Sequence, residues 1–237
     1  QLPNKFLCLE RPVARMPMGR AYPHPVEQER RRAAAVRFLL IHADPTGDLP
    51  AARREVEHIA DTLRQRWGDA VQVHILERAS ADGDHLNAVL RSAEYDVIHY
   101  AGHARFDIAQ PDQSALVLHR GEELTAEKIS RLLKGRPLVF LNACETGKTA
   151  NEKKPQAVGR FLQRPAEGLA TAFIYAGALA YVGSLWPIYD DAAAAFAASF
   201  YSDLVEGYTL GEAMRRARLH SRTAYARQIT WASYVLF

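Results

Sequence analysis

One cysteine is placed where a nucleophile is useful. Cys144 directly follows the apolar run at 138–143 and precedes Glu145-Thr146-Gly147. A free cysteine is often only a small buried apolar residue, and that interpretation stays open. Its position between a predicted strand and a polar loop instead indicates a sulfur that a substrate can reach. Because the reactive species is the thiolate, a nearby imidazole must lower the thiol pKa or accept its proton.

Among nine histidines, His103 is the best placed partner for this thiol. It follows a predicted strand at 95–100, and its neighbours Gly102 and Ala104 carry minimal side-chain bulk, which permits a close approach by a substrate backbone. His42 and His99 lie in or beside apolar strands and are predicted to be structural. No further ligands stand at suitable spacing for a metal site, so we expect neither a metal nor a cofactor.

Strand and helix patterns alternate along most of the chain. Apolar or alternating runs predict strands at 36–41, 71–75, 95–100, 115–118, 137–143, 178–185 and 231–237, with amphipathic helices between most of them. This alternation predicts an α/β fold with a mainly parallel central sheet flanked by helices on both faces. Since ligands bind beyond the carboxyl ends of such strands, His103 and Cys144 are expected to meet at one sheet edge.

Composition excludes several classes of protein. The 237 residues are 48% hydrophobic and 24% charged, which is typical of a globular chain with one large domain or two small ones. No apolar run reaches the roughly 18–20 residues of a membrane-spanning helix, and the N-terminus lacks a secretion signal. Two cysteines exclude a disulfide-dense scaffold. These features indicate a cytoplasmic protein, and the absence of an initial Met indicates a fragment of a longer one.

Residues 1–35 differ from the rest. They hold seven basic residues against three acidic ones and five of the twelve prolines, whereas residues 36–237 are nearly neutral. We therefore expect a linker or docking segment at 1–35, with no clear helical or strand period, and one domain at 36–237. With a nearly neutral body, the chain is expected to contact nucleic acid only indirectly, if at all.

The motifs around both residues resemble those of a known family. Tyr100-Ala101-Gly102-His103-Ala104 and Leu141-Asn142-Ala143-Cys144-Glu145-Thr146 are similar to the His and Cys motifs of CHAT domains, bacterial relatives of caspases, separases and gingipains. The similarity continues through segments at 168–178, 182–191, 200–204, 211–214 and 231–234, so that it covers about residues 36–237. It implies a caspase-like fold and a cysteine endopeptidase.

The resemblance also implies roles for particular residues. Cys144 would attack the scissile carbonyl, and His103 would accept and later donate the proton. Backbone N–H groups of Gly102 or Ala104, and of Cys144, would hold the oxyanion; relatives often have Gly where this chain has Ala104. No third member of a triad is evident. A protein substrate, control by a sensor domain or partner, and a role in bacterial defence or cell death are likewise implied.

Substrate preference points to acidic residues after the predicted strand at 178–185. In separase-like enzymes, an acid at the matching position of the segment that here begins at Trp186 binds arginine. Asp190 is therefore the better candidate, Asp191 the alternative, and Asp44 a weaker one, and Trp186 is a further expected substrate-binding residue. A helix N-cap or first-turn role for Asp190 or Asp191 remains open. A carboxylate in a partly dry pocket favours a basic side chain.

The sequence leaves two alternative functions and two interpretations of one polar segment. The chain is alternatively a catalytically inactive scaffold, although both dyad residues are present. A nucleotide-binding domain is disfavoured because His42-Ala43-Asp44-Pro45-Thr46-Gly47 lacks phosphate-binding glycine spacing. The polar segment at 147–165 is either a solvated loop or a mobile activation loop, with candidate self-cleavage sites after Arg160 or Lys154.

Overall fold

A computed structural model describes residues 6–16, 35–107, 109–145, 165–186 and 188–237. The side chains of residues 144, 145 and 165–167 lie outside that description. The loop expected at 147–165 also lies almost entirely outside the described residues, so its mobility and self-cleavage stay predictions.

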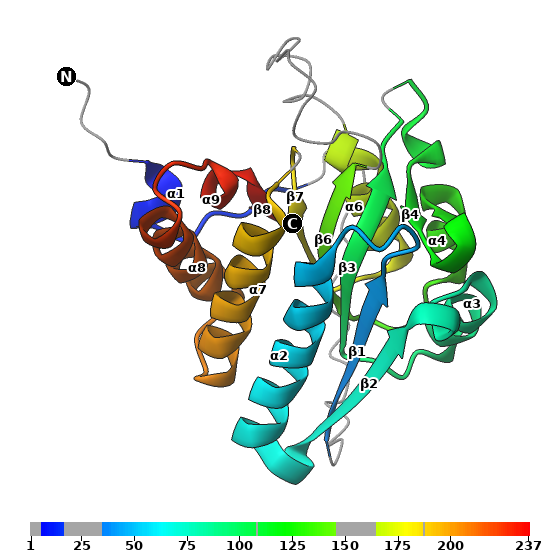
Figure 1. Cartoon of the computed structure of the whole chain (residues 1–237), viewed down its shortest axis with the longest axis horizontal. Helices are drawn as coiled ribbons and strands as arrows, with labels where there is room; N and C mark the ends of the chain where they lie inside the picture. The colour runs from blue at the N-terminus through cyan, green and yellow to red at the C-terminus, as the bar shows by residue number, and fades with distance from the viewer. Residues whose placement is uncertain (1–5, 17–34, 108, 146–164, 187) are drawn as a thin grey trace.

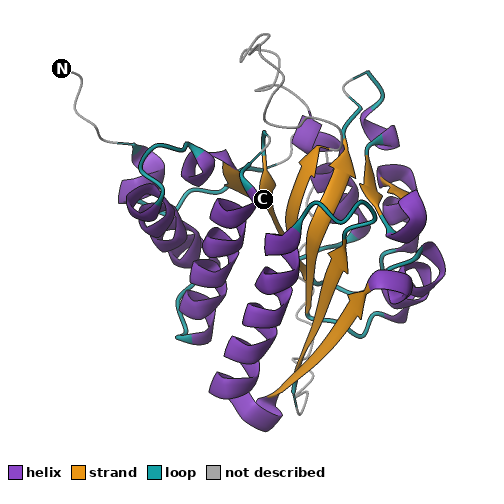
Figure 2. Cartoon of the chain, viewed as in Figure 1, coloured by secondary structure: helices purple, strands orange, loops and turns teal. Residues whose placement is uncertain are grey.

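An eight-stranded sheet forms the centre of the molecule (Figures 1 and 2). Its strands are β1 (Val36–Ala43), β2 (Val71–Glu77), β3 (Val97–Arg105), β4 (Ala115–Val117), β5 (Glu123–Thr125), β6 (Leu138–Glu145), β7 (Ala180–Ser184) and β8 (Tyr234–Leu236). The main order is β2-β1-β3-β6-β7-β8, while β4 pairs with β3 and β5. Pairs among β2, β1, β3, β6 and β7 are parallel, and those made by β4, β5 and β8 are antiparallel.

Helices cover both faces of this sheet (Figure 1). They are α1 (Leu7–Glu10), α2 (Pro50–Trp67), α3 (Gly83–Ser92), α4 (Ala126–Leu132), α6 (Pro165–Ala176), α7 (Asp190–Val205), α8 (Leu210–Ala224) and α9 (Thr230–Ser233). One core cluster joins the sheet to α2, α7 and α8, and the other joins it to α3, α4 and α6. The predicted α/β architecture, a mainly parallel sheet with helices on both faces, is confirmed.

Strand alternation explains the two cores. In β1, Phe38 and Leu40 face α2, whereas Leu39 and Ile41 belong to the cluster on the opposite face. All four side chains are at most 3% exposed, so β1 is buried on both faces, as its continuous apolar run predicts. The sheet is thereby fixed between two helical layers, and only its edges and strand ends remain available for function.

Two sequence-based boundaries need correction, and the role of two acids at the start of α7 is decided. The strand predicted to end at Tyr100 continues as β3 to Arg105, because residues 103–105 gain an antiparallel partner in β4. The strand predicted over 231–237 is wrong in its first part: Thr230–Ser233 forms helix α9, and only Tyr234–Leu236 is strand. Helix α7 begins at Asp190 with Tyr189 as its N-cap, so the first-turn alternative for Asp190 and Asp191 is confirmed and the N-cap alternative is wrong.

Part of the N-terminal segment packs against the C-terminal helices. Leu9 in α1 is 6% exposed, and its carbonyl accepts a hydrogen bond from Nη1 of Arg215 in α8 at 3.1 Å. The backbone N–H of Arg15 donates to the carbonyl of Leu236 at 2.7 Å. Residues 6–16 are therefore tied to α8 and to β8.

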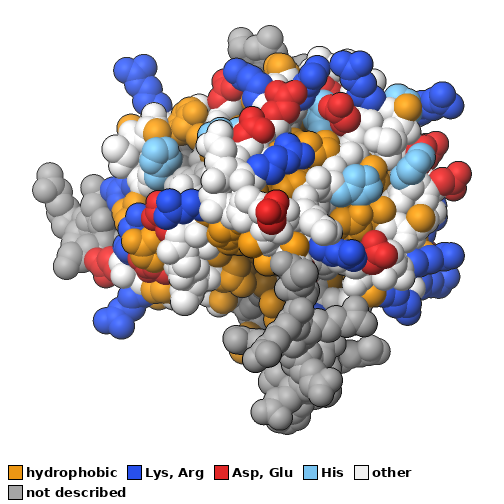
Figure 3. Space-filling model, turned by 90° about the horizontal axis from the view of Figure 1, so that it is seen from below, with side chains coloured by type: hydrophobic (Ala, Val, Ile, Leu, Met, Phe, Trp, Pro, Cys, Tyr) orange, Lys and Arg blue, Asp and Glu red, His pale blue; other side chains and the backbone are white. Residues whose placement is uncertain are grey.

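The surface at the amino ends of the central strands is seen from below in Figure 3. Basic and acidic side chains are interspersed on this face, with hydrophobic side chains between them. Within the described part of the chain, none of the helices combines the length and the apolar character that crossing a membrane requires.

Candidate active site

The register of the sheet brings the two predicted catalytic residues together. β3 and β6 are parallel neighbours, and His103 is the direct partner of Cys144. Adjacent strands lie about 4.8 Å apart, so a separation of 41 positions in sequence becomes one strand spacing. Both residues stand at the carboxyl end of their strands, the edge at which a doubly covered parallel sheet binds ligands.

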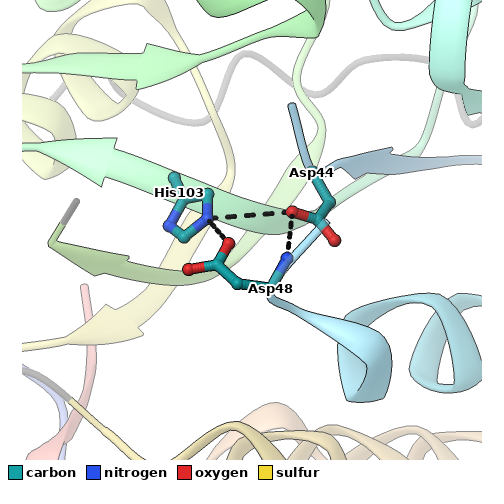
Figure 4. A group of neighbouring side chains, drawn as sticks. All are labelled: Asp44, Asp48 and His103. Atoms are coloured by element: carbon teal, nitrogen blue, oxygen red, sulfur yellow. Dashed lines mark hydrogen bonds and ion pairs between the residues drawn. The ribbon is translucent and has the colours of Figure 1, made fainter. Parts of the chain in front are cut away.

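His103 is held by an acidic side chain from the loop after β1 (Figure 4). Its ring is buried, and Nε2 lies 2.8 Å from Oδ1 of Asp48 and 3.1 Å from Oγ1 of Thr46. Because an ionised carboxylate only accepts hydrogen bonds, Nε2 carries the proton and donates it. The Thr46 hydroxyl donates to the same carboxylate oxygen. This hydroxyl first, and His103 further, lower the pKa of Asp48, so the carboxylate stays charged in mild acid.

Asp44 shapes the loop that delivers Asp48. Its Oδ1 accepts the backbone N–H groups of Gly47 at 2.8 Å and Asp48 at 3.2 Å, and its Oδ2 accepts that of Leu49 at 3.1 Å. The side chain is 8% exposed, and Oδ1 lies 3.8 Å from Nε2 of His103. Asp44 thus organises the turn between β1 and α2 and adds negative charge near the imidazole.

The other ring nitrogen of His103 is unoccupied within the described residues. Nδ1 is buried and makes no hydrogen bond to any of them. With the proton on Nε2, the lone pair of the neutral ring lies on Nδ1. A buried nitrogen with a free lone pair is suited to accept a proton from a group at the paired position of β6.

Gly102 is required by strand packing. A Cβ at this position would meet the carbonyl oxygen of Ala43 at 2.4 Å and the hydroxyl of Tyr100 at 2.8 Å. β1 and Tyr100 therefore approach the backbone more closely than any side chain allows. The absence of a side chain here serves the internal fit of β1 on β3, a reason that the sequence alone did not reveal.

The three predicted oxyanion positions differ in their strand pairing. Gly102 pairs with Ala43 on one side and Ala143 on the other. Ala104 pairs with Leu116 and with Glu145. In the described pairings Cys144 has a partner on β3 only, because the pairing of β6 with β7 ends at Leu141. Cys144 therefore has a paired residue on one side, whereas Gly102 and Ala104 each have paired residues on both.

The predicted substrate-binding acids point in different directions. Oδ2 of Asp190 accepts the backbone N–H of Ala51 in α2 at 2.9 Å, and burial raises the pKa of this half-buried carboxyl. Asp191 is exposed and forms an ion pair with Arg54 at 3.0 Å. Trp186 is half-buried and packs against the small cluster of Leu185 and Val235. Of these residues, only Asp190 lines a cavity that also reaches Gly102.

A buried polar network lies on the α2 and α7 side of the same strands. Oε1 of Glu55 accepts a hydrogen bond from Nδ2 of Asn142 at 2.6 Å and lies 2.8 Å from Nε2 of His99. The Tyr201 hydroxyl is 3.2 Å from Nδ1 of His99, and burial raises the pKa of Tyr201, which keeps its proton. The Tyr234 hydroxyl donates to Oδ1 of Asn142. This network fixes Glu55 beside Asn142, two positions before Cys144 on β6.

Asp48 is the residue that sequence reasoning missed. It lies 55 positions before His103, in the loop that follows β1 and that also holds Asp44. The available signal was a second acid in the turn after a strand adjacent to that of the histidine. Because that loop leaves the same sheet edge, any acid in it was a candidate partner for the imidazole.

Asp44, Asp48 and His103 also offer one ligand atom each within 4.8 Å of one another. Nε2 of His103 already contacts the Asp48 carboxylate, and Oδ1 of Asp44 already accepts two backbone N–H groups. Since the protein itself satisfies these atoms, we assign no metal to them.

Solved structures of low sequence identity share this fold. A search of curated protein sequences finds no match. The Arg-specific cysteine proteinase gingipain R is 15% identical with a TM-score of 0.61, over 84% of this chain and 45% of that chain. Separase in the Saccharomyces cerevisiae separase–securin complex is 14% identical with a TM-score of 0.51, over 86% and 12%. A structure described as a protease is 17% identical with a TM-score of 0.56, over 86% and 47%.

The chain thus spans less than half the length of each of these proteins, and their likeness establishes the caspase-like fold. The family follows from a second comparison, with protein-family models. The model of the CHAT domain matches residues 2–237, which include both the His and the Cys motif. This chain therefore belongs to the CHAT domain family, within the caspase-like cysteine peptidase fold.

Proposed function

We propose that this chain is a cysteine endopeptidase that cleaves a protein substrate after a basic residue. The observation that carries the proposal is the register of His103 opposite Cys144, with the imidazole oriented by Asp48. Positions in register across a parallel pair lie on the same face of the sheet. A nucleophile, a base and a group that orients the base are the parts that thiol catalysis requires.

The chemistry follows from the protonation of His103. Its Nδ1 accepts the proton of the Cys144 thiol, and the thiolate attacks the scissile carbonyl carbon. The carbonyl π pair moves to oxygen, where the backbone N–H of Cys144, with that of Gly102 or Ala104, would stabilise the charge. Collapse expels the amine, which takes the proton from Nδ1, and leaves a thioester. Water then attacks the thioester and restores the thiol, so each cycle consumes one water and one peptide bond.

The preference for a basic residue rests on Asp190. Its carboxylate is half-buried at the same sheet edge, and one of its oxygens is fixed by the N-terminus of α2. A charge-assisted contact with a lysine or arginine side chain would offset part of the cost of burying both charges.

Peptide cleavage tests the proposal. The wild-type chain, incubated with a peptide library, should cut after basic residues, as read by mass spectrometry of the products. Cys144→Ala should cut nothing, whereas Cys8→Ala should behave as wild type. A thiol-reactive peptide ketone with a basic residue should label Cys144. Cleavage by Cys144→Ala would contradict the assigned nucleophile, and neither cleavage nor labelling by wild type would favour an inactive scaffold.

We extend the proposal to regulation on the basis of family membership. The protease would act under a sensor domain or partner protein in a bacterial defence or cell-death system, in the cytoplasm. Expression in bacteria tests this role: the wild-type chain should cause growth arrest after an infection challenge, and Cys144→Ala should not. Equal growth of both strains under every challenge would count against it.

A further inference from the structure

A small cavity lies beneath the catalytic edge, between the N-terminal ends of α2 and α7. Its polar lining comes from Glu55, Asn142 and Asp190, and its apolar lining from Leu49 and two alanines. Gly102, the residue before His103, closes it on the sheet side. Its volume is about 10 Å³, room for one water-sized group.

Two carboxylate oxygens in this cavity lack partners within the described residues. Glu55 is 3% exposed and uses Oε1 for Asn142 and His99, while its Oε2 makes no hydrogen bond to a described residue. Oδ2 of Asp190 accepts the N–H of Ala51, and Oδ1 of Asp190 makes no hydrogen bond to a described residue. A nearly fully buried carboxylate with a free oxygen is costly unless a hydrogen-bond donor reaches it.

The charge around the cavity favours a cation. Glu55 and Asp191 both act on Asp190 to disfavour its charged form, and burial does so more strongly. Arg54 has the opposite effect and lowers the pKa of Asp190, but its guanidinium is paired with Asp191 at the surface. A positive group entering the cavity would contact both carboxylates and replace the water that they lose on burial.

Size and shape distinguish the two basic side chains. An ammonium group is a compact point charge with three donors, whereas a guanidinium is a planar fork with five. Glu55 cannot easily retreat to make room, because Asn142 and His99 hold it and the Asn142 amide is itself fixed by Tyr234. The space therefore suits an ammonium better than a guanidinium.

We propose that this cavity binds the ammonium group of a substrate lysine, with Glu55 and Asp190 as the specificity-determining carboxylates, so that the chain selects lysine over arginine before the scissile bond. The inference rests on the proposed function for its substrate, but the cavity itself does not need the thiol. Binding and cleavage therefore test the two ideas separately.

The cleavage experiment compares peptides that differ only in lysine, arginine or norleucine at this position. For wild type, kcat/KM should be at least tenfold higher for lysine than for arginine. Glu55→Gln should lower the lysine-to-norleucine ratio at least tenfold, because only the lysine side chain has a charge that pairs with this carboxylate. Glu57→Gln is the matched control, because Glu57 lies on the same helix but is exposed and pairs with Arg53. An arginine preference in wild type, or an unchanged ratio in Glu55→Gln, would overturn the inference.

The binding experiment uses Cys144→Ala, with and without the second substitution, and the same peptides in calorimetry. Lysine peptides should bind at least tenfold more tightly than arginine peptides, and Glu55→Gln should remove the difference. If circular dichroism shows that Glu55→Gln is unfolded, Asp190→Asn replaces it, because Asn keeps an acceptor for Ala51. Selective lysine binding without any cleavage by wild type would support the cavity and refute the protease. Cleavage without lysine selectivity would support the protease and refute the lysine-binding role of the cavity.

Discussion

At the scale of single residues, the proposed chemistry depends on which nitrogen of the His103 imidazole carries the proton. Asp48 accepts a hydrogen bond from Nε2–H of His103, and the lone pair on Nδ1 has no partner among the described residues. The same ring without Asp48 would populate both tautomers, and only one of them has its basic nitrogen available. Asp48 is therefore a positioning residue that acts through His103.

Replacing Asp48 with Ala should lower kcat about tenfold or more with little change in KM, because it affects the base and not substrate binding. The nitrogen-15 spectrum of the His103 ring should shift from the Nε2–H form towards a mixture of tautomers. Asp61→Ala, an exposed acid on α2, is the control. Unchanged kcat with an unchanged tautomer would contradict the role assigned to Asp48.

Alanine substitution of the two buried histidines on β3 should affect different properties: cleavage for His103 and stability for His99. His103→Ala should abolish cleavage and leave the fold intact, because the ring lies at the catalytic edge. His99→Ala should cost about 3 kcal/mol or more in the free energy of unfolding, because it removes the buried imidazole beside the Glu55 carboxylate and leaves only Asn142 to compensate that charge. Chemical denaturation and a peptide assay measure both effects. Cleavage that survives in His103→Ala and is lost in a folded His99→Ala would mean that His99 is the base.

Lowering the pH should weaken the preference for basic substrates at a higher pH than that at which an aspartate of usual pKa takes up a proton. Burial, with Glu55 and Asp191, raises the pKa of Asp190 above its usual 3.8, while the Ala51 N–H and Arg54 act in the opposite direction. As pH falls through that raised pKa, Asp190 takes up a proton and loses its charge. The lysine-to-norleucine ratio of kcat/KM should therefore be full above this pH and decline below it. In Asp190→Asn the ratio should be smaller and lack this decline.

At the scale of elements, the strand ends position the site, and most of them were predictable. The apolar runs predicted the core strands and the sheet class, because strands buried on both faces carry a continuous signal. The added length of β3 and the helix α9 were not predictable, since they depend on pairing with β4 and on local packing. Asp48 was missed for the same reason: its partner is distant in sequence and only the folded loop brings them together.

The close contact of β1 with β3 gives a prediction about Gly102. Gly102→Ala should destabilise the protein by about 1–3 kcal/mol, because the new Cβ must push against the backbone carbonyl of Ala43. Gly83→Ala is the matched control: its Cβ would meet only Oε2 of the Glu122 side chain, which can move. Urea denaturation should therefore show a much lower midpoint for Gly102→Ala than for Gly83→Ala. Equal midpoints would mean that the strands relax at no cost.

At the scale of the whole molecule, the two ends of the described chain are joined beside the sheet edge at β8. The N–H of Arg15 extends the pairing of Leu236, and the ring of Phe6 lies 5.2 Å from that of Trp231. β8 also leads into the network under the site, because the Tyr234 hydroxyl bonds to Asn142. Residues 6–16 therefore contact both α8 and β8, which adjoin the elements around the cavity lined by Asp190.

This arrangement predicts that residues 6–16 contribute to the stability of the domain. Leu9→Ala should lower the free energy of unfolding by about 2–3 kcal/mol, because its side chain is 6% exposed and its helix α1 packs against α8. Leu7→Ala, two positions away and 63% exposed, should cost less than about 0.5 kcal/mol. Denaturant unfolding followed by circular dichroism measures both. A cooperative transition shifted only in Leu9→Ala would mean that the segment unfolds together with the sheet. Equal stability of the two variants would instead mean that residues 6–16 are a tether whose contacts do not stabilise the domain.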